Sequence, residues 1–336
     1  MKKVICIGSA TKDIFITLNE TKITENKKSL TEKKLMSFEF GAKIYAENLI
    51  EEVGGSAVNV AAGLNLGEVR SFVFARTSKS EVGKWVEKRI GKLKVKKNYM
   101  QRRGSEPSEV SAIISDKANL DHVIMRTGDS VEWFDLEKAL NKFREKVDWI
   151  YVGSQKKNSL DKMKKIVEFA ENKKAKIVFI PSSYQIENDL EVLSAHFEKI
   201  EIIFVNRDEA LEILQNLEIE FKDEPSNLLQ EIKKLGFEKV VITDGAKGAY
   251  VCHSEGSFHL GINKTKKIET VGAGDAFASG FLSAYIDSAD IKKSLAWGIA
   301  NSGAVLTEIG STKGLLNKKE MKNQETDLIK KIKPIK

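Results

Sequence analysis

Six short apolar runs, separated by longer amphipathic stretches, narrow the folds open to this chain. The runs cover residues 4–7, 72–75, 149–152, 177–180, 202–205 and 240–243. Continuous apolar runs of this length are typical of strands that are buried on both faces. Because they alternate with helical patterns, the chain is predicted to be an α/β protein with a mostly parallel sheet covered by helices.

Helical periodicity marks several of the stretches between the runs. After Asn158 an apolar stripe recurs at Leu160, Met163, Ile166, Val167 and Ala170. A second helix is predicted to begin near Pro225 and to end at Gly236. A later pair over 276–286 and 291–308 is rich in Ala, Gly and Ser. We expect this pair to pack tightly against the sheet or to approach a ligand closely.

Composition excludes several classes of protein. With 336 residues, of which 41% are hydrophobic, the chain is able to bury a large core in one big domain or two smaller ones. Its net charge of +7 comes from lysines that are spread along the chain and concentrated over 318–336. Because no basic and aromatic stripe is present, a solvated surface is favoured over nucleic-acid binding.

Cysteine usage and hydropathy bear on location. Cys6 and Cys252 are far apart and lack the spacing of a metal site, which is typical of reduced thiols in the cytoplasm. No apolar stretch reaches the roughly 18 to 20 residues of a membrane span, and the first residues enter a strand pattern rather than a signal peptide. We expect a soluble cytoplasmic protein with no membrane partner.

Two segments interrupt the alternation. Residues 14–50 contain a strand pattern at 15–18, a polar lysine-rich loop and a return through 35–45, and residues 98–127 contain two further strand patterns. Together they are predicted to form a small sheet beside the main one, a lid that keeps water from the site. A peripheral edge hairpin is the alternative. The tail over 317–336 is expected to be a charged helix or a partly disordered end.

A glycine-bracketed turn at 270–275, Thr-Val-Gly-Ala-Gly-Asp, is the main chemical motif. Gly272 and Gly274 allow successive amide groups to converge on an anion at a helix start. Beside them Asp275 is placed to take a proton from a hydroxyl that attacks a phosphoryl group. An ordinary helix cap is the alternative. A dinucleotide fingerprint is rejected, because the preceding residues 263–269 are polar and do not form an apolar strand.

Two earlier stretches carry polar groups suited to a ligand. Gly54 and Gly55 open a helix with a small-residue surface, from which Asn59 projects. Asp13 follows the first predicted strand, at the carboxyl edge where open α/β sheets bind ligands. Its carboxylate is suited to accept hydrogen bonds from two neighbouring sugar hydroxyls.

These stretches, in this order and at this separation, resemble the two signatures of the ribokinase-like carbohydrate kinases, the PfkB family. The resemblance runs from Val4 to about Leu316 and includes the segments 206–209 and 243–248. It implies a three-layer α/β/α sandwich with a mostly parallel central sheet and a small β-sheet lid. It also implies one kinase domain over 1–316, with lid segments at about 14–50 and 98–127.

The resemblance implies a role for each matching position. Asp275 resembles the catalytic base, and Gly272, Ala273 and Gly274 resemble its anion hole. Asp13, Gly54, Gly55 and Asn59 resemble substrate contacts. ATP is implied to contact Asn206, Thr243, Gly245, Gly248 and Asn301, with Glu209 helping to organise Mg²⁺. The alternatives are a helix cap for Asn206 and a solvated carboxylate at a helix start for Glu209.

Three positions depart from the family pattern. Glu269 stands where the family usually has Asp in a monovalent-cation site, so a need for K⁺ is an open question. Residues 180–183 read Ile-Pro-Ser-Ser where an Asn-Pro or Asp-Pro pair is common. The sugar-binding glutamate of ribokinases has no clear match around residues 153–155. The identity of the substrate is therefore left open.

The sequence predicts an ATP-dependent kinase that phosphorylates a sugar hydroxyl. The alternatives are a nucleoside kinase, then a sugar-phosphate kinase, and outside enzymes a catalytically silent sugar or nucleotide sensor. Four arginines are candidates for a substrate phosphate, although surface charge is the favoured explanation for Arg76, Arg102, Arg103 and Arg126.

The edge strands of the lid expose backbone groups that another chain could pair with, so a homodimer through the lid is expected.

Overall fold

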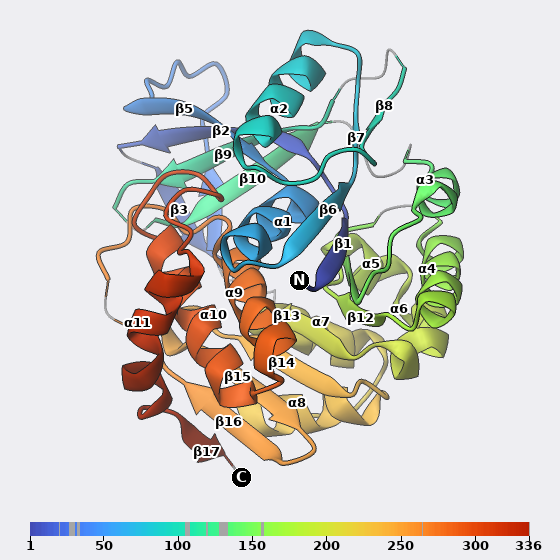
Figure 1. Cartoon of the computed structure of the whole chain (residues 1–336). Helices are drawn as coiled ribbons and strands as arrows, with labels where there is room; N and C mark the ends of the chain where they lie inside the picture. The colour runs from blue at the N-terminus through green and yellow to red at the C-terminus, as the bar shows by residue number, and fades with distance from the viewer. Residues whose placement is uncertain are drawn as a thin grey trace.

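A nine-stranded sheet forms the centre of the molecule in the computed structural model (Figure 1). The structure describes residues 1–19, 21–26, 31, 34–104, 108–118, 120–127, 134–155, 158–263 and 265–335. The strand order is β17-β16-β15-β14-β13-β12-β11-β1-β6. The strands are β1 (Lys3–Ile7), β6 (Arg70–Phe74), β11 (Trp149–Val152), β12 (Lys176–Phe179), β13 (Ile202–Asn206), β14 (Lys239–Thr243), β15 (Ala249–His253), β16 (Gly256–Leu260) and β17 (Lys333–Ile335).

The six apolar runs form the parallel part of this sheet, from β6 to β14. Beyond β14 the pairing is antiparallel through β15, β16 and β17. The predicted mostly parallel sheet is therefore confirmed. Its antiparallel end was not predicted, because β16 and β17 contain no continuous apolar run, and the run Ala-Tyr-Val-Cys in β15 does not by itself show in which direction that strand pairs.

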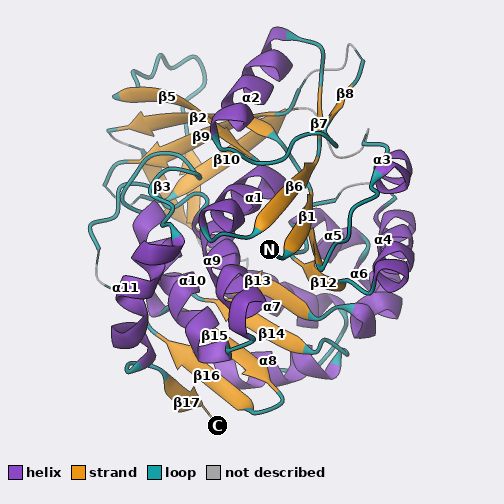
Figure 2. Ribbon diagram, in the orientation of Figure 1, coloured by secondary structure: helices purple, strands orange, loops and turns teal. Residues whose placement is uncertain are grey.

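Successive side chains along each strand point to opposite faces of the sheet and belong to two separate hydrophobic cores. In β1, Val4 and Cys6 belong to the core on one face, and Ile5 and Ile7 to the core on the other. Helices α1 (Ser56–Leu66), α2 (Glu81–Lys92), α9 (Ala273–Ser288) and α10 (Ile291–Val305) cover the first face, while the helices within residues 136–234 cover the second (Figure 2). This gives the three-layer α/β/α arrangement.

The helices match the periodicity seen in the sequence, including the predicted pair that became α9 and α10. Their bounds are α1 (Ser56–Leu66), α2 (Glu81–Lys92), α3 (Leu136–Lys142), α4 (Ser159–Lys173), α5 (Ser183–Asn188), α6 (Leu190–Leu193), α7 (Arg207–Asn216), α8 (Pro225–Lys234), α9 (Ala273–Ser288), α10 (Ile291–Val305) and α11 (Lys318–Ile329). Within the described residues, none of these helices has both the length and the apolar character needed to cross a membrane.

A second sheet of four strands projects beside the main one, at the upper left of Figure 1. Its order is β10 (His122–Thr127), β9 (Val110–Asp116), β2 (Thr11–Leu18) and β5 (Asn48–Gly54). Two short ribbons accompany it: β3 (Lys22–Glu25) with β4 (Lys34–Ser37), and β7 (Arg76–Thr77) with β8 (Gln101–Arg102). Both predicted lid segments therefore contribute to the small sheet, although part of the lysine-rich loop between β3 and β4 lies outside the described residues.

The return strand differs from the prediction over 35–45. Strand β4 ends at Ser37, and the chain re-enters the lid only with β5. Gly41 has a φ of 77°, which an extended strand does not adopt, and Phe40 and Tyr45 are exposed. The apolar residues that suggested a strand therefore lie in a surface loop.

The carboxyl-terminal segment is more structured than its lysines suggested. Helix α11 buries Met321 and Leu328, seven residues apart and thus on one face, beneath a charged exterior. Strand β17 then pairs with β16 at the edge of the main sheet. Residues 317–335 are thus continuous with the fold of the preceding chain.

Candidate active site

The predicted residues from the two ends of the chain meet at one point. Asn59 of α1 donates a hydrogen bond from Nδ2 to Oδ2 of Asp275 at the start of α9, over 2.9 Å. Both side chains line a cavity of about 190 Å³, together with Asp13, Gly55 and Gly272. The cavity lies between the lid and the carboxyl ends of the parallel strands, where open α/β sheets bind ligands.

Asp13 reaches this cavity from β2 of the lid. Its Oδ1 accepts a 2.7 Å hydrogen bond from Thr11 Oγ1, and the side chain is buried. Burial raises the pKa of Asp13, while hydrogen bonds from Thr11 and Ser111 lower it. Gly54 does not line the cavity; a Cβ there would lie 1.8 Å from Asp13 Oδ2. Gly54 therefore acts by leaving room for this carboxylate.

The glycine turn has the geometry of an anion site. Gly272 has a φ of 88° and precedes α9, so the first amides of the helix, which have no acceptor within the helix itself, begin directly after it. A Cβ on Gly272 would meet Ser311 at 2.5 Å, whereas one on Gly274 would meet nothing within 4 Å. Gly272 is thus required by its backbone and its neighbour, and Gly274 keeps the turn open.

Asp275 has the electrostatic character of a base that works near neutral pH. The pKa of Asp275 is raised to about 6, mainly by burial, and the charge of Asp13 acts in the same direction. The hydrogen bonds from Asn59 and Tyr151 lower it, as does the charge of Arg126. The carboxylate is therefore ionised at neutral pH, with a proton affinity well above that of an exposed aspartate.

Two further polar atoms face the same cavity. Asn59 Oδ1 and Ser311 Oγ are buried and have no hydrogen-bond partner among the residues that the structure describes. Buried polar groups are nearly always satisfied, so their natural partners are the groups of a ligand. Sequence reasoning missed Ser311, which lies in a loop after α10 and belongs to no motif.

A second cavity, of about 400 Å³, shares the glycine turn and Asp275 with the first. Asn206 and Glu209 line it as well. They form a reciprocal cap at the start of α7: Glu209 N donates to Asn206 Oδ1, and Asn206 N donates to Glu209 Oε2, each over 2.8 Å. The cap and the ligand-binding interpretation are therefore compatible, because Glu209 Oε1 is left for the cavity.

Glu209 is suited to a divalent cation. Burial raises the pKa of Glu209 to about 7, and the charges of Glu212, Asp208 and Asp275 act in the same direction. A cation beside this acidic group would relieve that cost. Within the described ranges, no group of three or more His, Cys, Asp or Glu side chains is placed to hold a metal ion by itself. Magnesium commonly takes only one or two carboxylates beside the phosphates of a nucleotide, so Glu209 fits such a site.

A third cavity, of about 180 Å³, adjoins the other side of the turn. Thr243, Gly245 and Gly248 line it, as predicted for a nucleotide loop. Gly248 has a φ of 97°, and a Cβ there would lie 2.1 Å from the carbonyl oxygen of Leu260. Glycine is therefore required at this position.

Asn301 does not line the nucleotide cavity, contrary to the prediction. It is fully buried, donates from Nδ2 to Ala276 O over 2.8 Å, and accepts at Oδ1 from Leu316 N over 2.8 Å. Its amide therefore ties α9 and α10 to the segment before α11. The adjacent Ser302 and Gly303 line the cavity instead.

Glu269, the position linked with a monovalent cation, has its carboxylate occupied. Oε1 accepts hydrogen bonds from Thr270 N over 2.7 Å and Val271 N over 3.2 Å, and Oε2 accepts one from Ser115 Oγ over 2.9 Å. Three donors already converge on these oxygens, so the carboxylate does not fit a K⁺ site.

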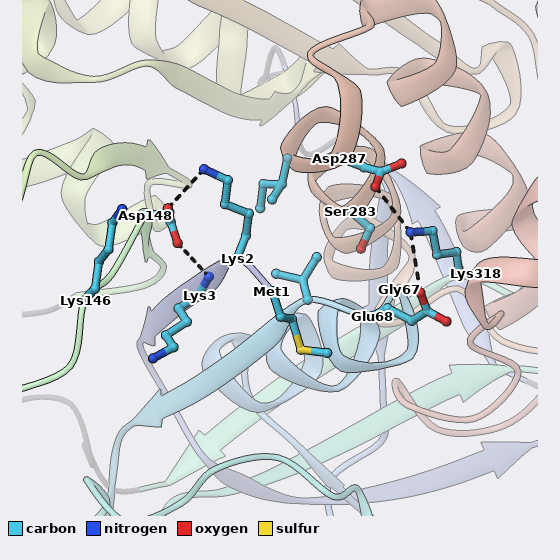
Figure 3. Close-up of a pocket in the computed structure, with 12 residues that line it drawn as sticks. Met1, Lys2, Lys3, Gly67, Glu68, Lys146, Asp148, Ser283, Asp287 and Lys318 are labelled. Carbon is cyan, nitrogen blue, oxygen red and sulfur yellow. Dashed lines mark hydrogen bonds and ion pairs between the residues drawn. The ribbon is translucent and has the colours of Figure 1, made fainter.

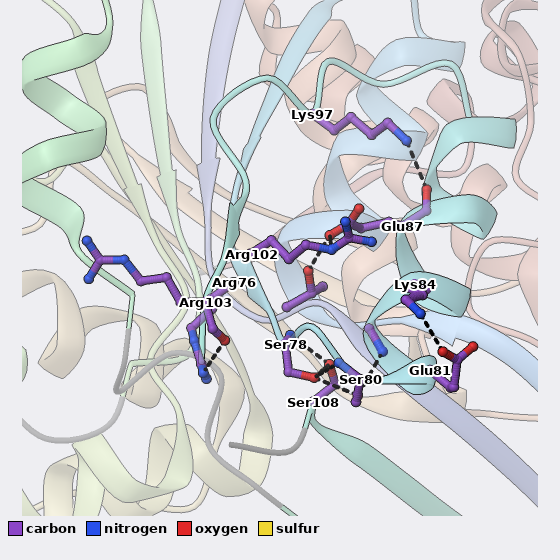
Figure 4. Close-up of polar contacts among 12 residues, drawn as sticks. Arg76, Ser78, Ser80, Glu81, Lys84, Glu87, Lys97, Arg102, Arg103 and Ser108 are labelled. Atoms are coloured by element: carbon purple, nitrogen blue, oxygen red, sulfur yellow. Dashed lines mark hydrogen bonds and ion pairs between the residues drawn. The ribbon is translucent and has the colours of Figure 1, made fainter. Parts of the chain in front are cut away.

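Of the four arginines considered for a substrate phosphate, only Arg126 lines the 190 Å³ cavity. It pairs there with Glu109 of the lid. The other three lie elsewhere (Figure 4): Arg76 is buried and donates to Arg103 O, Arg102 pairs with Glu87, and Arg103 pairs with Asp135.

A larger cavity, of about 600 Å³, lies at the amino ends of β1 and β11 (Figure 3). Several of its charged groups are engaged in ion pairs: Lys2 pairs with Asp148 over 3.1 Å, and Lys318 pairs with Asp287 over 3.2 Å. Ligands of such sheets bind at the opposite, carboxyl edge. The candidate site is therefore assigned to the smaller cavities around Asp275.

Comparison with known proteins identifies the family of the chain. Residues 1–318 match the model of the pfkB family carbohydrate kinases. The chain therefore belongs to this family and is a phosphotransferase with an alcohol group as acceptor. It is 23% identical over 283 residues to the ATP-dependent 6-phosphofructokinase of Thermoanaerobacterium thermosaccharolyticum, covering 82% of this chain and 86% of that one.

Solved structures share the fold across nearly the whole chain. The nucleoside kinase of Methanocaldococcus jannaschii superposes with a TM-score of 0.76 at 18% identity, over 97% of this chain and 99% of that one. The Arabidopsis thaliana ribokinase, solved with ribose and ATP, gives 0.73 at 17% identity, over 98% of each chain. The ribokinase-like fold is thus confirmed.

Replacing Gly54 with alanine tests how strictly the site depends on Asp13. The Gly54→Ala variant is expected to lose about 10²-fold in kcat/KM, because the new methyl group must displace the Asp13 carboxylate. Steady-state kinetics with the best sugar acceptor measures this loss. Gly91→Ala, which meets only the flexible end of Lys97, is the matched control and should retain full activity. Normal kinetics in Gly54→Ala would contradict the role given to Asp13.

Proposed function

We propose that this protein transfers the terminal phosphate of ATP to a hydroxyl group of a sugar, with Asp275 as the general base. The contact between Asn59 and Asp275 is the main support for this proposal. It places the base on the boundary between a small cavity lined by hydrogen-bonding groups and a second cavity that contains the glycine turn and Glu209. A sugar in the first and ATP in the second would have their reacting groups on either side of the turn.

The proposed chemistry is a single transfer. Asp275 accepts the proton of the substrate hydroxyl as its oxygen forms a bond to the γ-phosphorus, while the bond from that phosphorus to the ADP oxygen breaks. The amides at Gly272, Ala273 and Gly274 stabilise the charge on the phosphoryl oxygens. Asp13, Asn59 and Ser311 hold the sugar, with Gly55 lining its cavity. Glu209 would hold magnesium, which supplies charge neutralisation at the phosphates.

The residues that line the 190 Å³ cavity support a ranking of the possible acceptors. Its polar lining, including Asp13, Asn59 and Ser311, suits the many hydroxyl groups of a sugar, and a nucleoside is the next candidate. Arg126 gives specific support to the third candidate, a sugar that carries a phosphate. The use of ATP and the free thiols of Cys6 and Cys252 support a cytoplasmic location.

A panel of acceptors separates these candidates. ADP release measured with pentoses, hexoses, sugar phosphates and nucleosides should show turnover with a free sugar. Strong preference for a nucleoside or a sugar phosphate would move the assignment to that alternative. Binding of sugar or nucleotide without turnover on any acceptor would favour a sensor.

Asp275→Asn tests the base directly. The amide keeps the shape of the side chain but cannot accept the proton, so kcat should fall by roughly 10² to 10⁴. Sugar and ATP affinities, measured by calorimetry, should stay within a few-fold of wild type. Unchanged turnover would rule out Asp275 as the base.

The pH dependence of the reaction should report the same group. The base is active when ionised, so kcat should fall about tenfold per pH unit below the Asp275 pKa of about 6 and level off above it. Saturating magnesium keeps Glu209 ionised and separates the two groups. The acid limb should vanish from the residual activity of Asp275→Asn. Its persistence at the same pH would assign the limb to another residue.

The lid also supports a homodimer. Both of its outer strands, β5 and β10, expose apolar side chains, with Leu49 at 63% and Met125 at 50%. Unpaired edges and exposed apolar surface of this kind are usually covered by another chain. Sedimentation at micromolar concentration should give a dimer, and a double change of Leu49→Lys and Met125→Lys should shift it towards monomer. A wild-type protein that is monomeric throughout would exclude the lid dimer.

A further inference from the structure

The lid contacts the glycine turn through two side chains that no motif singled out. Ser115 of β9 donates from Oγ to Glu269 Oε2 over 2.9 Å, in a buried contact. His122 of β10 lies with Nδ1 3.1 Å from Thr270 Oγ1, and Thr270 Oγ1 donates to Leu120 O over 3.3 Å. Two neighbouring residues before the anion site are thus bonded to the lid.

Glu269 transmits this contact to the turn itself. One carboxylate oxygen accepts the lid serine, and the other accepts the amides of Thr270 and Val271. Glu269 is only 4% exposed, and hydrogen bonds from these three donors compensate for the burial of its carboxylate. Val271 is followed directly by Gly272, whose left-handed backbone begins the anion site.

The other side of the segment is fixed to the body of the protein. Ile268 N and Glu269 N both donate to Leu306 O, at the end of α10, over 2.7 and 3.3 Å. The backbone of 268–269 is therefore anchored to the rigid helical layer. The following residues, 270–272, take their shape from the Glu269 carboxylate and from the lid.

We propose that Ser115 and Glu269 form a latch through which closure of the lid sets the shape of the anion hole, with His122 and Thr270 as its second contact. The latch rests on the proposed phosphoryl transfer at this turn. When the lid lifts, Glu269 loses one of three donors and Thr270 loses its lid partners, so the amides at 272–274 lose their alignment. The anion hole is then complete only when the lid covers the sugar, and a phosphate is not exposed to water in an active arrangement.

Ser115 and Glu269 are positioning residues in this scheme, since neither lines the cavities around Asp275 described above. Loss of a buried hydrogen bond to a carboxylate should cost about ten- to a hundredfold in kcat for Ser115→Ala. The KM values for sugar and ATP should stay within about twofold, because the binding groups are untouched. Thr127→Ala, on lid strand β10 where the exposed hydroxyl donates to Val110 O, is the control and should behave as wild type.

A double-mutant cycle distinguishes a latch from two separate defects. Glu269→Gln removes the charge that the turn amides and Ser115 share. The double variant of Ser115→Ala with Glu269→Gln should lose no more kcat than Glu269→Gln alone, within about threefold. Additive losses, or an unchanged kcat in Ser115→Ala, would overturn the latch.

Hydrogen exchange provides a readout that does not need turnover. Amides of 270–275 should exchange several-fold faster in Ser115→Ala than in wild type or Thr127→Ala, with Mg-ATP present and absent, while amides of the central strands stay protected. Equal exchange at 270–275 in all three proteins would refute the latch even if the kinase assignment holds. Faster exchange in a protein that phosphorylates no acceptor would support the latch and refute the proposed function.

Discussion

The hydrogen bond between the amide of Asn59 and the carboxylate of Asp275 is the interaction on which the site depends. It joins residues 216 positions apart and holds the acidic side chain at the boundary of two cavities. It also opposes the cost of burying a charge, since the donated hydrogen bond lowers the pKa that burial raises. Without it, the carboxylate would be protonated over more of the physiological range and free to turn away.

Small residues make this contact attainable. Helices α1 and α9 pack against each other, and the positions where they approach are occupied by glycine on α1 or just after its end and by serine on α9. A Cβ at Gly63 would lie 2.1 Å from Ser279 Oγ, and one at Gly67 would lie 2.2 Å from Ser283 Oγ. Larger side chains at these positions would push the helices apart and carry Asn59 out of reach of Asp275.

Much of the fold follows from local sequence pattern, and less of the site does. Continuous apolar runs identified every parallel strand of the main sheet because such strands are buried on both faces, whereas β16 and β17 lacked this signal. Glycines with special backbone requirements, such as Gly272 and Gly248, stood out because few other residues satisfy them. Ser311 and Ser115 did not, because a serine in a loop or a strand gains significance only from what the tertiary fold places beside it. Arg126 was one of four arginine candidates that the sequence did not distinguish from one another. Asn301 shows the opposite case: its position near a motif suggested a ligand contact, but its amide makes hydrogen bonds to other residues of the protein.

The two cavities that share the Gly272–Asp275 edge have a stereochemical consequence. An acceptor in the smaller cavity and a nucleotide in the larger one lie on opposite sides of that edge, so the incoming oxygen and the departing ADP occupy opposite faces of the phosphorus atom. A single displacement of this kind inverts the configuration at phosphorus. With a nucleotide made chiral at its terminal phosphorus, the sugar product would therefore carry the mirror-related configuration, and a covalent relay through the protein would leave the original one.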